Sequence, residues 1–417
     1  MNAMDIALER GADFVQISNV RSEITELALR GTSFEFNHNS TSINCVRLLY
    51  NGVWGIASSN RENPENLVDL AIKQARSIKS EGIELAEAKM AEGVFNFKQE
   101  VDDEEIKEII RDLYNTIPGF SEIVFVKEVI ARRIQNSDGA DAVETKSLLS
   151  LSISTFAGNS VVSAEVGGID SKLIENNAEN IVENTLSRIR GVSNARILNP
   201  LMRGIKLPVI LTKEAACAYV HEMVHNLEAD VVIERGESLY GKSDELTVYD
   251  DPSYAGFGFY AFDDEGVLSR RKTLIKDGEV DNYLHTRFTA RVFGDEPKGN
   301  GRGLYTFPKA FMSNVIVKKG SWTLEEMISE TREGFIVEGL VEGKTHKNYV
   351  VIFPELAWYI RNGEVRHPAK VESVKIPLNL SLVVGVGKEY FERIAYEKSF
   401  ALAEVSPPIL IEKASLN

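Results

Sequence analysis

The residues best suited to chemistry lie together in one short segment, His221-Glu222-x-x-His225. On a helix, side chains four residues apart project from the same face, about one turn apart. Two imidazoles at that spacing can bind one zinc ion through ring nitrogens at about 2.0–2.1 Å. Glu222 projects beside them and can take a proton from a zinc-bound water and later pass it to a leaving amine. This pattern is typical of a metal-dependent peptidase, with the histidines as ligands and Glu222 as the general base.

The sequence around the motif supports this interpretation. The chain has only six histidines, and no Pro or Gly interrupts residues 213–234, which we therefore expect to form one helix. Glu228 follows His225 by three residues on the same stripe. Because it lies about 10.5 Å along the axis from His221, we expect it to accept a hydrogen bond from a ligand's second ring nitrogen rather than to bind the metal. The simpler alternative is a surface helix with two solvated histidines.

A peptidase zinc site needs three protein ligands and an open position for water. The motif supplies two ligands, so the third must come from elsewhere in the chain. The glycine-rich run from Gly299 to Gly303 does not match the residue order of a phosphate-binding loop. Its composition favours a flexible hairpin or substrate-binding loop. Within it, Arg302 is a candidate for binding a substrate carboxylate. The alternative is an ordinary solvated arginine.

Length and composition limit the possible classes of protein. A chain of 417 residues is too long for one ordinary core, so two domains are expected. Apolar residues at 43% and charged residues at 26% are typical of a globular protein. The net charge of -15 makes nucleic-acid binding unfavourable. Without a signal-peptide pattern or a membrane-spanning run, we expect a cytoplasmic protein.

The pattern of elements predicts an α+β fold. Strand-like runs flank the hairpin signal Asn51–Gly52, and amphipathic spacing predicts helices over 64–79, 102–116 and 176–191. Residues 1–198 are therefore predicted to form an N-terminal domain with a mainly antiparallel sheet and helices on it. Residues 199–417 are predicted to form a strand-rich C-terminal domain, which carries the metal-site helix and one further helix at 323–330.

Beyond the motif, long stretches of the chain resemble the TldD/PmbA family of metallopeptidases, also called modulators of DNA gyrase. The resemblance runs almost from end to end and involves the segments Ile24–Phe36, Val46–Ser59, Thr212–Asp230, Leu246–Gly266, Asp281–Gly303, Val341–Val365 and Val405–Leu416. It implies a two-domain α+β subunit that works as a dimer, either with itself or with a PmbA/TldE-like sister subunit. It also implies zinc as the cofactor and unfolded peptides as substrates. Because His221 and His225 are present, the chain resembles the catalytic TldD branch.

The resemblance also bears on the third ligand. In the family this ligand is a cysteine that follows a Gly-Val-Gly-like turn, whereas no cysteine follows Gly385-Val386-Gly387 here. A carboxylate is an acceptable zinc ligand, so Glu389 and Glu392 are the candidates that the sequence offers instead. The alternative is a non-catalytic peptide-binding partner subunit with a degenerate metal site.

Overall fold

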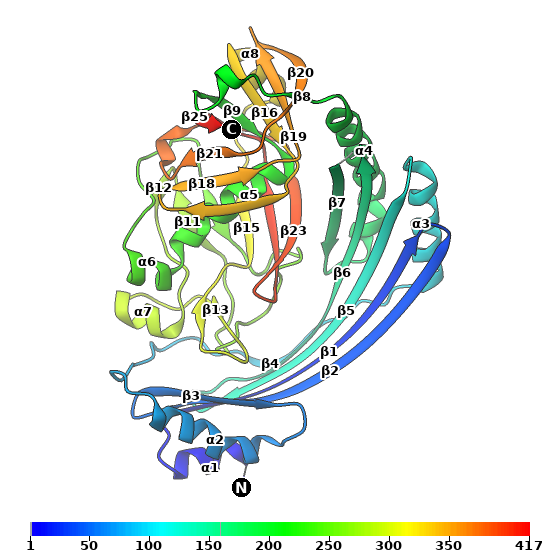
Figure 1. The fold of residues 1–417 in the computed structure, drawn as a ribbon. Helices are drawn as coiled ribbons and strands as arrows, with labels where there is room; N and C mark the ends of the chain where they lie inside the picture. Colours follow the sequence, from blue (N-terminus) through cyan, green and yellow to red (C-terminus); the bar gives the residue numbers. More distant parts are fainter. Residues whose placement is uncertain (1, 159) are drawn as a thin grey trace.

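The structure, a computed structural model, describes residues 2–158 and 160–417. It has the expected α+β class. A long curved sheet from the N-terminal part of the chain runs along one side of the molecule, and the strands of the C-terminal part gather on its concave side (Figure 1).

Within the described residues, the N-terminal sheet has seven strands in the order β3-β2-β1-β5-β6-β4, with β7 paired to β6. All neighbours are antiparallel except β4 and β6. The strands are β1 (Phe14–Arg30), β2 (Ser33–Tyr50), β3 (Val53–Ser59), β4 (Glu92–Phe97), β5 (Ser121–Asn136), β6 (Asp141–Ala157) and β7 (Ser160–Gly168). The predicted hairpin at Asn51–Gly52 is confirmed. It joins β2 to β3, and both of its residues have positive φ, as a tight two-residue turn requires.

Four helices cover this sheet, and apolar stripes hold them there. They are α1 (Ala3–Glu9), α2 (Pro64–Ser77), α3 (Asp103–Thr116) and α4 (Lys172–Asn194). The first two pack on one end of the sheet through a core that includes Leu67 and Val46. The other two share a second core with Ile110 and Phe125. The three helices that the periodicity predicts in this part of the chain are thus present.

Two further sheets enclose the helix that carries the motif. In the described residues, the ten-stranded sheet runs β17-β18-β21-β25-β9-β16-β19-β20-β8, with β22 paired to β25, and the six-stranded sheet runs β12-β11-β10-β15-β24-β23. Their strands are β8 (Arg196–Ile197), β9 (Lys206–Leu211), β10 (Val248–Asp250), β11 (Lys272–Lys276), β12 (Glu279–Val280), β15 (Asn314–Val317), β16 (Glu333–Glu338), β17 (Glu342–His346), β18 (Tyr349–Phe353), β19 (Leu356–Arg361), β20 (Glu364–Lys370), β21 (Val374–Pro377), β22 (Val383–Val386), β23 (Phe391–Glu397), β24 (Phe400–Ser406) and β25 (Ile409–Leu416). The short pair β13 (Gly301–Arg302) and β14 (Lys309–Ala310) lies apart from both.

The helix α5 (Lys213–Val224) lies between these two sheets and contacts β23 and β24 on one side and β17 and β18 on the other. Its residues from Ala215 to Val224 are all buried. A helix that is apolar on most of its circumference is stable only when other elements cover it on all sides. The two sheets therefore fix the position of the motif-bearing helix within the core.

The prediction of one helix over residues 213–234 is wrong. The α-helix ends at Val224, a 3₁₀ turn covers His225–Leu227, and a second helix, α6 (Ala229–Arg235), follows. The cause is tertiary. The backbone of Leu284 donates to the carbonyl of Leu227 and accepts from the N–H of Ala229, so these groups cannot continue the helix.

Another helix, α7 (Arg287–Phe293), lies in a region where the sequence suggested mainly strands. The sequence signals for the start and end of this helix are present, but the helix between them is short. Thr286 and Thr289 form a reciprocal capping pair at its start, and Gly294 ends it in the left-handed conformation. The remaining helix α8 (Leu324–Glu330) agrees with the prediction. No helix in the described part of the chain combines the length and apolar character that crossing a membrane requires.

We propose that the chain divides into two domains close to residue 198, as the sequence suggests. The short strand β8 pairs with β20 of the ten-stranded sheet, although it precedes residue 199. A boundary a few residues earlier, directly after α4, is therefore the better position for this division. The helix α4 itself contacts β6 and β7 of the N-terminal sheet and also β20, so it lies at the junction.

His285, which precedes α7, is expected to make stability depend on pH. Burial lowers the pKa of this histidine to about 4, although Asp295 lies 3.5 Å from its Nε2. A histidine in an unfolded chain titrates near 6.5, so between about pH 6.5 and 4 the unfolded state binds more protons than the folded state. Stability should therefore fall as the pH decreases through this window, by at most about 1.4 kcal/mol per pH unit from this residue. Urea unfolding of His285→Gln beside the parent chain tests this. The variant should lose less stability on acidification, and parallel pH profiles would contradict the assignment.

Candidate metal centre

The two histidines of the motif face each other at the C-terminal end of α5. Their Nε2 atoms are 3.0 Å apart, and their ring centroids are separated by 4.6 Å. His225 caps α5 and still has helical dihedral angles, so the spacing of four residues keeps its geometry although the α-helix ends there. The structure thus brings the predicted pair together around one point.

A third group, which the sequence does not suggest, reaches the same point. Oε2 of Glu397 lies 2.8 Å from Nε2 of His221 and 3.0 Å from Nε2 of His225. Glu397 is the last residue of β23, and a two-residue turn, Lys398–Ser399, leads directly into β24. The three residues are the one group of His, Cys, Asp and Glu side chains, among those described, whose ligand atoms lie close enough to share a metal ion.

Glu389 and Glu392, the carboxylates suggested by the sequence, lie elsewhere. Side chains alternate between the two faces of a strand, so Glu392 and Glu397, five residues apart on β23, point to opposite sides. Glu392 accepts a hydrogen bond from the hydroxyl of Tyr254 at 2.7 Å. Glu389 precedes β23 and lines a separate cavity that also includes Trp322. The geometry favours Glu397 in their place.

Each histidine has a carboxylate behind its other ring nitrogen. Nδ1 of His225 lies 2.6 Å from Oε1 of Glu228, the contact expected from the sequence. Nδ1 of His221 lies 2.8 Å from Oε1 of Glu404, a buried residue of β24 that the sequence gave no means of finding. The second oxygen of Glu404 accepts a hydrogen bond from Arg393 at 2.6 Å. The hydrogen bond at His225 and the close charge contact at His221 both leave Nε2 free to bind a cation.

The electrostatics of this group favour positive charge at the shared point. Burial opposes protonation of both rings, but the surrounding carboxylates outweigh it. Glu404 and Glu397 raise the pKa of His221, and Glu228 and Glu397 raise the pKa of His225 to about 10. Burial also opposes ionisation of Glu397, yet the two imidazoles hold its pKa far below the usual range. The group is therefore built to stabilise a cation, whether a proton or a metal ion.

The donor set fits a zinc ion in both chemistry and spacing. Two imidazole nitrogens and a carboxylate oxygen are the ligand types of a catalytic zinc site that keeps a fourth position open. Ligand atoms of a tetrahedral zinc ion lie about 3.3 Å apart, so the observed separations of 2.8–3.0 Å would need to open by only about half an ångström.

Glu222 lines the same cleft as the three candidate ligands. The cleft has a volume of about 480 Å³. One wall is formed by α5 and α6, a second by β17, and a third by the hairpin of β23 and β24. Oε2 of Glu222 accepts a hydrogen bond from the hydroxyl of Thr345 on β17 at 3.1 Å, and Gly343 lies next to the Glu222 side chain. The predicted general base is thus held between the helix and an edge strand.

Arg302, the predicted substrate-binding residue, does not line this cleft. Its guanidinium carbon lies over the rings of Tyr260 and Phe400 at 4.5 and 4.3 Å, and its Nε lies 3.7 Å from the buried carboxylate of Asp264. Those contacts hold the side chain inside the protein, 10% exposed. The structure therefore gives no support to a contact between Arg302 and a substrate bound at the metal centre.

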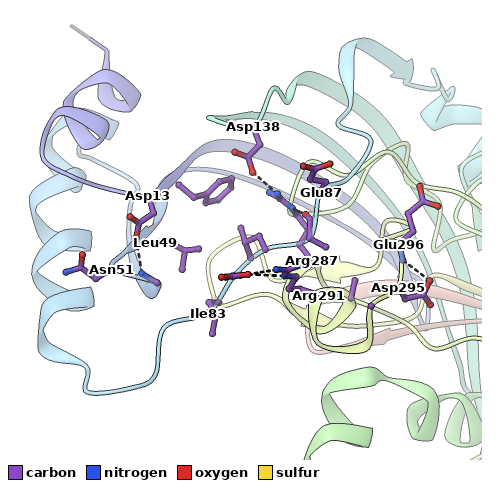
Figure 2. Close-up of a pocket in the computed structure, with 17 residues that line it drawn as sticks. Asp13, Leu49, Asn51, Ile83, Glu87, Asp138, Arg287, Arg291, Asp295 and Glu296 are labelled. Atoms are coloured by element: carbon purple, nitrogen blue, oxygen red, sulfur yellow. Dashed lines mark hydrogen bonds and ion pairs between the residues drawn. The ribbon is translucent and has the colours of Figure 1, made fainter.

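A larger cavity lies elsewhere and has a different character. It has a volume of about 1130 Å³ and lies between the ends of β1 and β2, the segment around Ile83 and the helix α7 (Figure 2). Six of its lining side chains are acidic, and its two arginines already pair with two of these, Arg287 with Asp138 and Arg291 with Glu84. No histidine or cysteine occurs among the described residues that line it. The described lining of this cavity therefore contains no second set of histidine and carboxylate ligands.

Comparison with known proteins identifies relatives of the chain. Two family models match it, described as the PmbA/TldA metallopeptidase central domain, over residues 98–189, and the PmbA/TldA metallopeptidase C-terminal domain, over residues 204–416. A metalloprotease of Methanocaldococcus jannaschii is 32% identical over 358 residues, which cover 78% of this chain and 78% of the relative. A protein of Saccharolobus solfataricus named zinc metalloprotease TldD homolog is 23% identical over 390 residues, which cover 87% and 86%.

The fold has a close counterpart among solved structures. TldE from Thermococcus kodakarensis aligns with a TM-score of 0.79 at 19% sequence identity, covering 99% of this chain and 98% of that one. This likeness concerns the course of the backbone. It extends over both the curved N-terminal sheet and the strands around the metal centre.

Proposed function

The chain belongs to the PmbA/TldD family of metallopeptidases, and from this premise we propose that it is a zinc-dependent peptidase that hydrolyses unfolded or extended peptides. The observation that carries the proposal is the convergence of His221, His225 and Glu397 on one point of the cleft that also contains Glu222. The name of the Saccharolobus solfataricus relative supports zinc as the metal.

In this proposal each residue has a defined role. His221, His225 and Glu397 hold the ion, and Glu228 and Glu404 orient the two imidazoles. A zinc ion bound there would lower the pKa of a bound water to about 7 and polarise the peptide carbonyl. Glu222 takes the proton of the attacking water and later delivers it to the leaving amine. Thr345 keeps the carboxylate of Glu222 in the cleft through its hydroxyl hydrogen bond.

The edge strand β17 provides a reason for the preference for extended peptides. Among the residues that the structure describes, it is the last strand of the ten-stranded sheet and pairs on one side only, with β18. Its residues Gly343–Thr345 line the cleft beside Glu222. A peptide that adds to this edge would be held by main-chain hydrogen bonds, which are indifferent to side-chain identity and require an unfolded substrate.

We also propose that the chain works as a dimer, with itself or with a PmbA/TldE-like subunit. The similarity of its fold to TldE supports this proposal, because two subunits of one fold can build equivalent interfaces. Light scattering of the purified chain, alone and mixed with such a subunit, distinguishes the two kinds of dimer.

Metal removal is the direct test of the proposed activity. The purified chain is expected to contain about one zinc ion, as is usual for a single three-ligand site, and to cleave an unfolded polypeptide but not the same polypeptide when folded. A chelator should abolish cleavage, and adding zinc should restore it. A zinc-free chain that binds unfolded peptide without cleaving it would instead support the alternative, a non-catalytic peptide-binding partner. Zinc binding without cleavage of any peptide would also contradict the proposal.

A further inference from the structure

The cleft at the metal centre is lined by a positive charge on each of its three walls. Arg235 comes from α6, Lys344 from β17, and Lys398 from the turn between β23 and β24. The chain as a whole has a net charge of -15, with 62 acidic and 47 basic residues. Among the lining residues, four Lys and Arg side chains stand against three Glu, whereas acidic residues are in excess in the protein as a whole. The larger cavity beside α7, by contrast, is lined by six acidic side chains and two arginines (Figure 2).

The acidic side chains that line the cleft already have partners within the protein. Glu222 accepts from Thr345, Glu228 contacts His225, and Glu397 contacts both imidazoles. Arg393, a fourth cation of the lining, is likewise engaged by the buried Glu404. Of these acids, Glu397 also contacts one outer cation, Lys398, and its other oxygen is shared between the two imidazoles.

The three outer cations form exposed ion pairs, and Nζ of Lys344 and of Lys398 also lies over the rings of Phe353 and Phe311, at 4.5 and 4.7 Å. The side chain of Lys344 is 49% exposed, and its Nζ lies 3.3 Å from Oε2 of Glu342. The side chain of Arg235 is 68% exposed, and its Nε lies 3.9 Å from Oε1 of Glu234. Lys398 is 59% exposed. Its Nζ lies 3.1 Å from Oε1 of Glu397, whereas the histidines contact Oε2. Exposed pairs of this kind contribute only about 0–1 kcal/mol, so an incoming carboxylate can replace them at little cost.

We propose that this metal centre selects peptides that carry carboxylates close to the scissile bond. The recognised chemistry is the carboxylate itself, from an Asp or Glu side chain or from the free C-terminus of a short peptide. The inference rests on the proposed peptidase function and adds a substrate class to it. Exposed cations on three walls of a cleft attract anionic ligands and raise their association rate. The positive walls also disfavour peptides rich in Lys and Arg.

Hydrolysis of four matched peptides tests this proposal and separates the two sources of carboxylate. The peptides share one scissile sequence, have Glu or Gln on both sides of it, and end in either a free carboxylate or an amide. The expected result is about a 5- to 10-fold higher kcat/KM for the carboxylate-bearing peptides, the combined effect of two or three exposed ion pairs. A gain with Glu assigns the side chains, and a gain with the free terminus assigns the terminal group. The preference should shrink at about 1 M salt, where the Debye length is about 3 Å.

The triple variant Arg235→Gln/Lys344→Gln/Lys398→Gln should reduce this preference to within about twofold, because the exposed pairs are gone. A control variant with the same change in net charge should retain the preference for carboxylate-bearing peptides.

The control substitutes three cations whose side chains do not line the cleft: Arg10→Gln, Lys107→Gln and Lys413→Gln. If the parent chain cleaves all four peptides at equal rates, this inference is wrong and the peptidase function stands. If the zinc-loaded chain cleaves none of them, the peptidase function itself fails. A preference that survives in the triple variant would also overturn the inference.

Discussion

Replacing Glu222 with Gln is expected to reduce kcat for peptide hydrolysis by about 10²- to 10⁴-fold while leaving the zinc content unchanged. The amide cannot accept the proton of the attacking water, so general-base catalysis is lost. Gln has the shape of Glu, and its remaining oxygen can still accept the hydrogen bond from Thr345. The ligands His221, His225 and Glu397 are untouched, so metal binding should persist.

Two measurements on the same preparation test this expectation: metal analysis and the rate of cleavage of an unfolded peptide. The matched control is Glu108→Gln, which removes an exposed carboxylate from helix α3, away from the cleft, and should retain the parent rate. A Glu222→Gln variant that binds zinc and still cleaves at the parent rate would exclude Glu222 as the base. Loss of zinc together with activity would instead indicate a structural role for this side chain.

Replacing Glu397 with Gln is expected to weaken zinc binding strongly, and therefore to lower activity at limiting zinc. Loss of a partner behind a zinc ligand typically weakens metal affinity by about 10- to 100-fold, and loss of a ligand itself should cost more. In Glu397→Gln the two imidazoles keep their orientation through Glu228 and Glu404 but lose the anionic oxygen between them. The variant should therefore fold normally and yet require a much higher zinc concentration for activity.

The controls for this experiment are Glu389→Gln and Glu392→Gln, the two carboxylates that the sequence pointed to. Both should bind zinc as tightly as the parent chain, because Glu389 lines a different cavity and Glu392 contacts Tyr254. Zinc titration monitored by competition with a chromogenic chelator gives the three affinities side by side. A loss of affinity in either control but not in Glu397→Gln would reassign the third ligand.

The part of the site that could be predicted from sequence is the part that depends on local geometry. The spacing of His221, Glu222 and His225 sets their relative positions through the helix alone, and the contact of Glu228 with His225 spans only three residues. Glu397 and Glu404 follow from tertiary structure, 172 residues or more beyond His225. Because no local pattern links them to the motif, their positions depend on how the two sheets pack around α5.

Turn chemistry explains why some elements were predictable and others were not. The hairpin at Asn51–Gly52 uses residues that favour positive φ, so its sequence reveals it. The turn that positions Glu397 has the same type of backbone, with φ of 50° at Lys398 and 71° at Ser399, but neither residue favours that conformation. The pairing of β23 with β24 holds the turn in place, and the sequence carries no sign of it.

The end of α5 at Val224 is a second feature that only tertiary structure explains. Residues 213–234 contain no helix breaker, yet the backbone of Leu284 takes the hydrogen bonds that a longer helix would use. At Glu228 the backbone is extended, and Oε1 of this residue still lies 2.6 Å from Nδ1 of His225. The three-residue spacing therefore keeps the contact although the helix ends before it.

The position of Glu397 at the tip of a hairpin has a consequence for folding as well as for catalysis. An ion held by His225 and Glu397 would act as a cross-link that closes a loop of 172 residues. Such a cross-link would raise the free energy of unfolding by mass action, since the unfolded chain cannot bring the three ligands together. Zinc supply would then affect the stability of the protein as well as its activity.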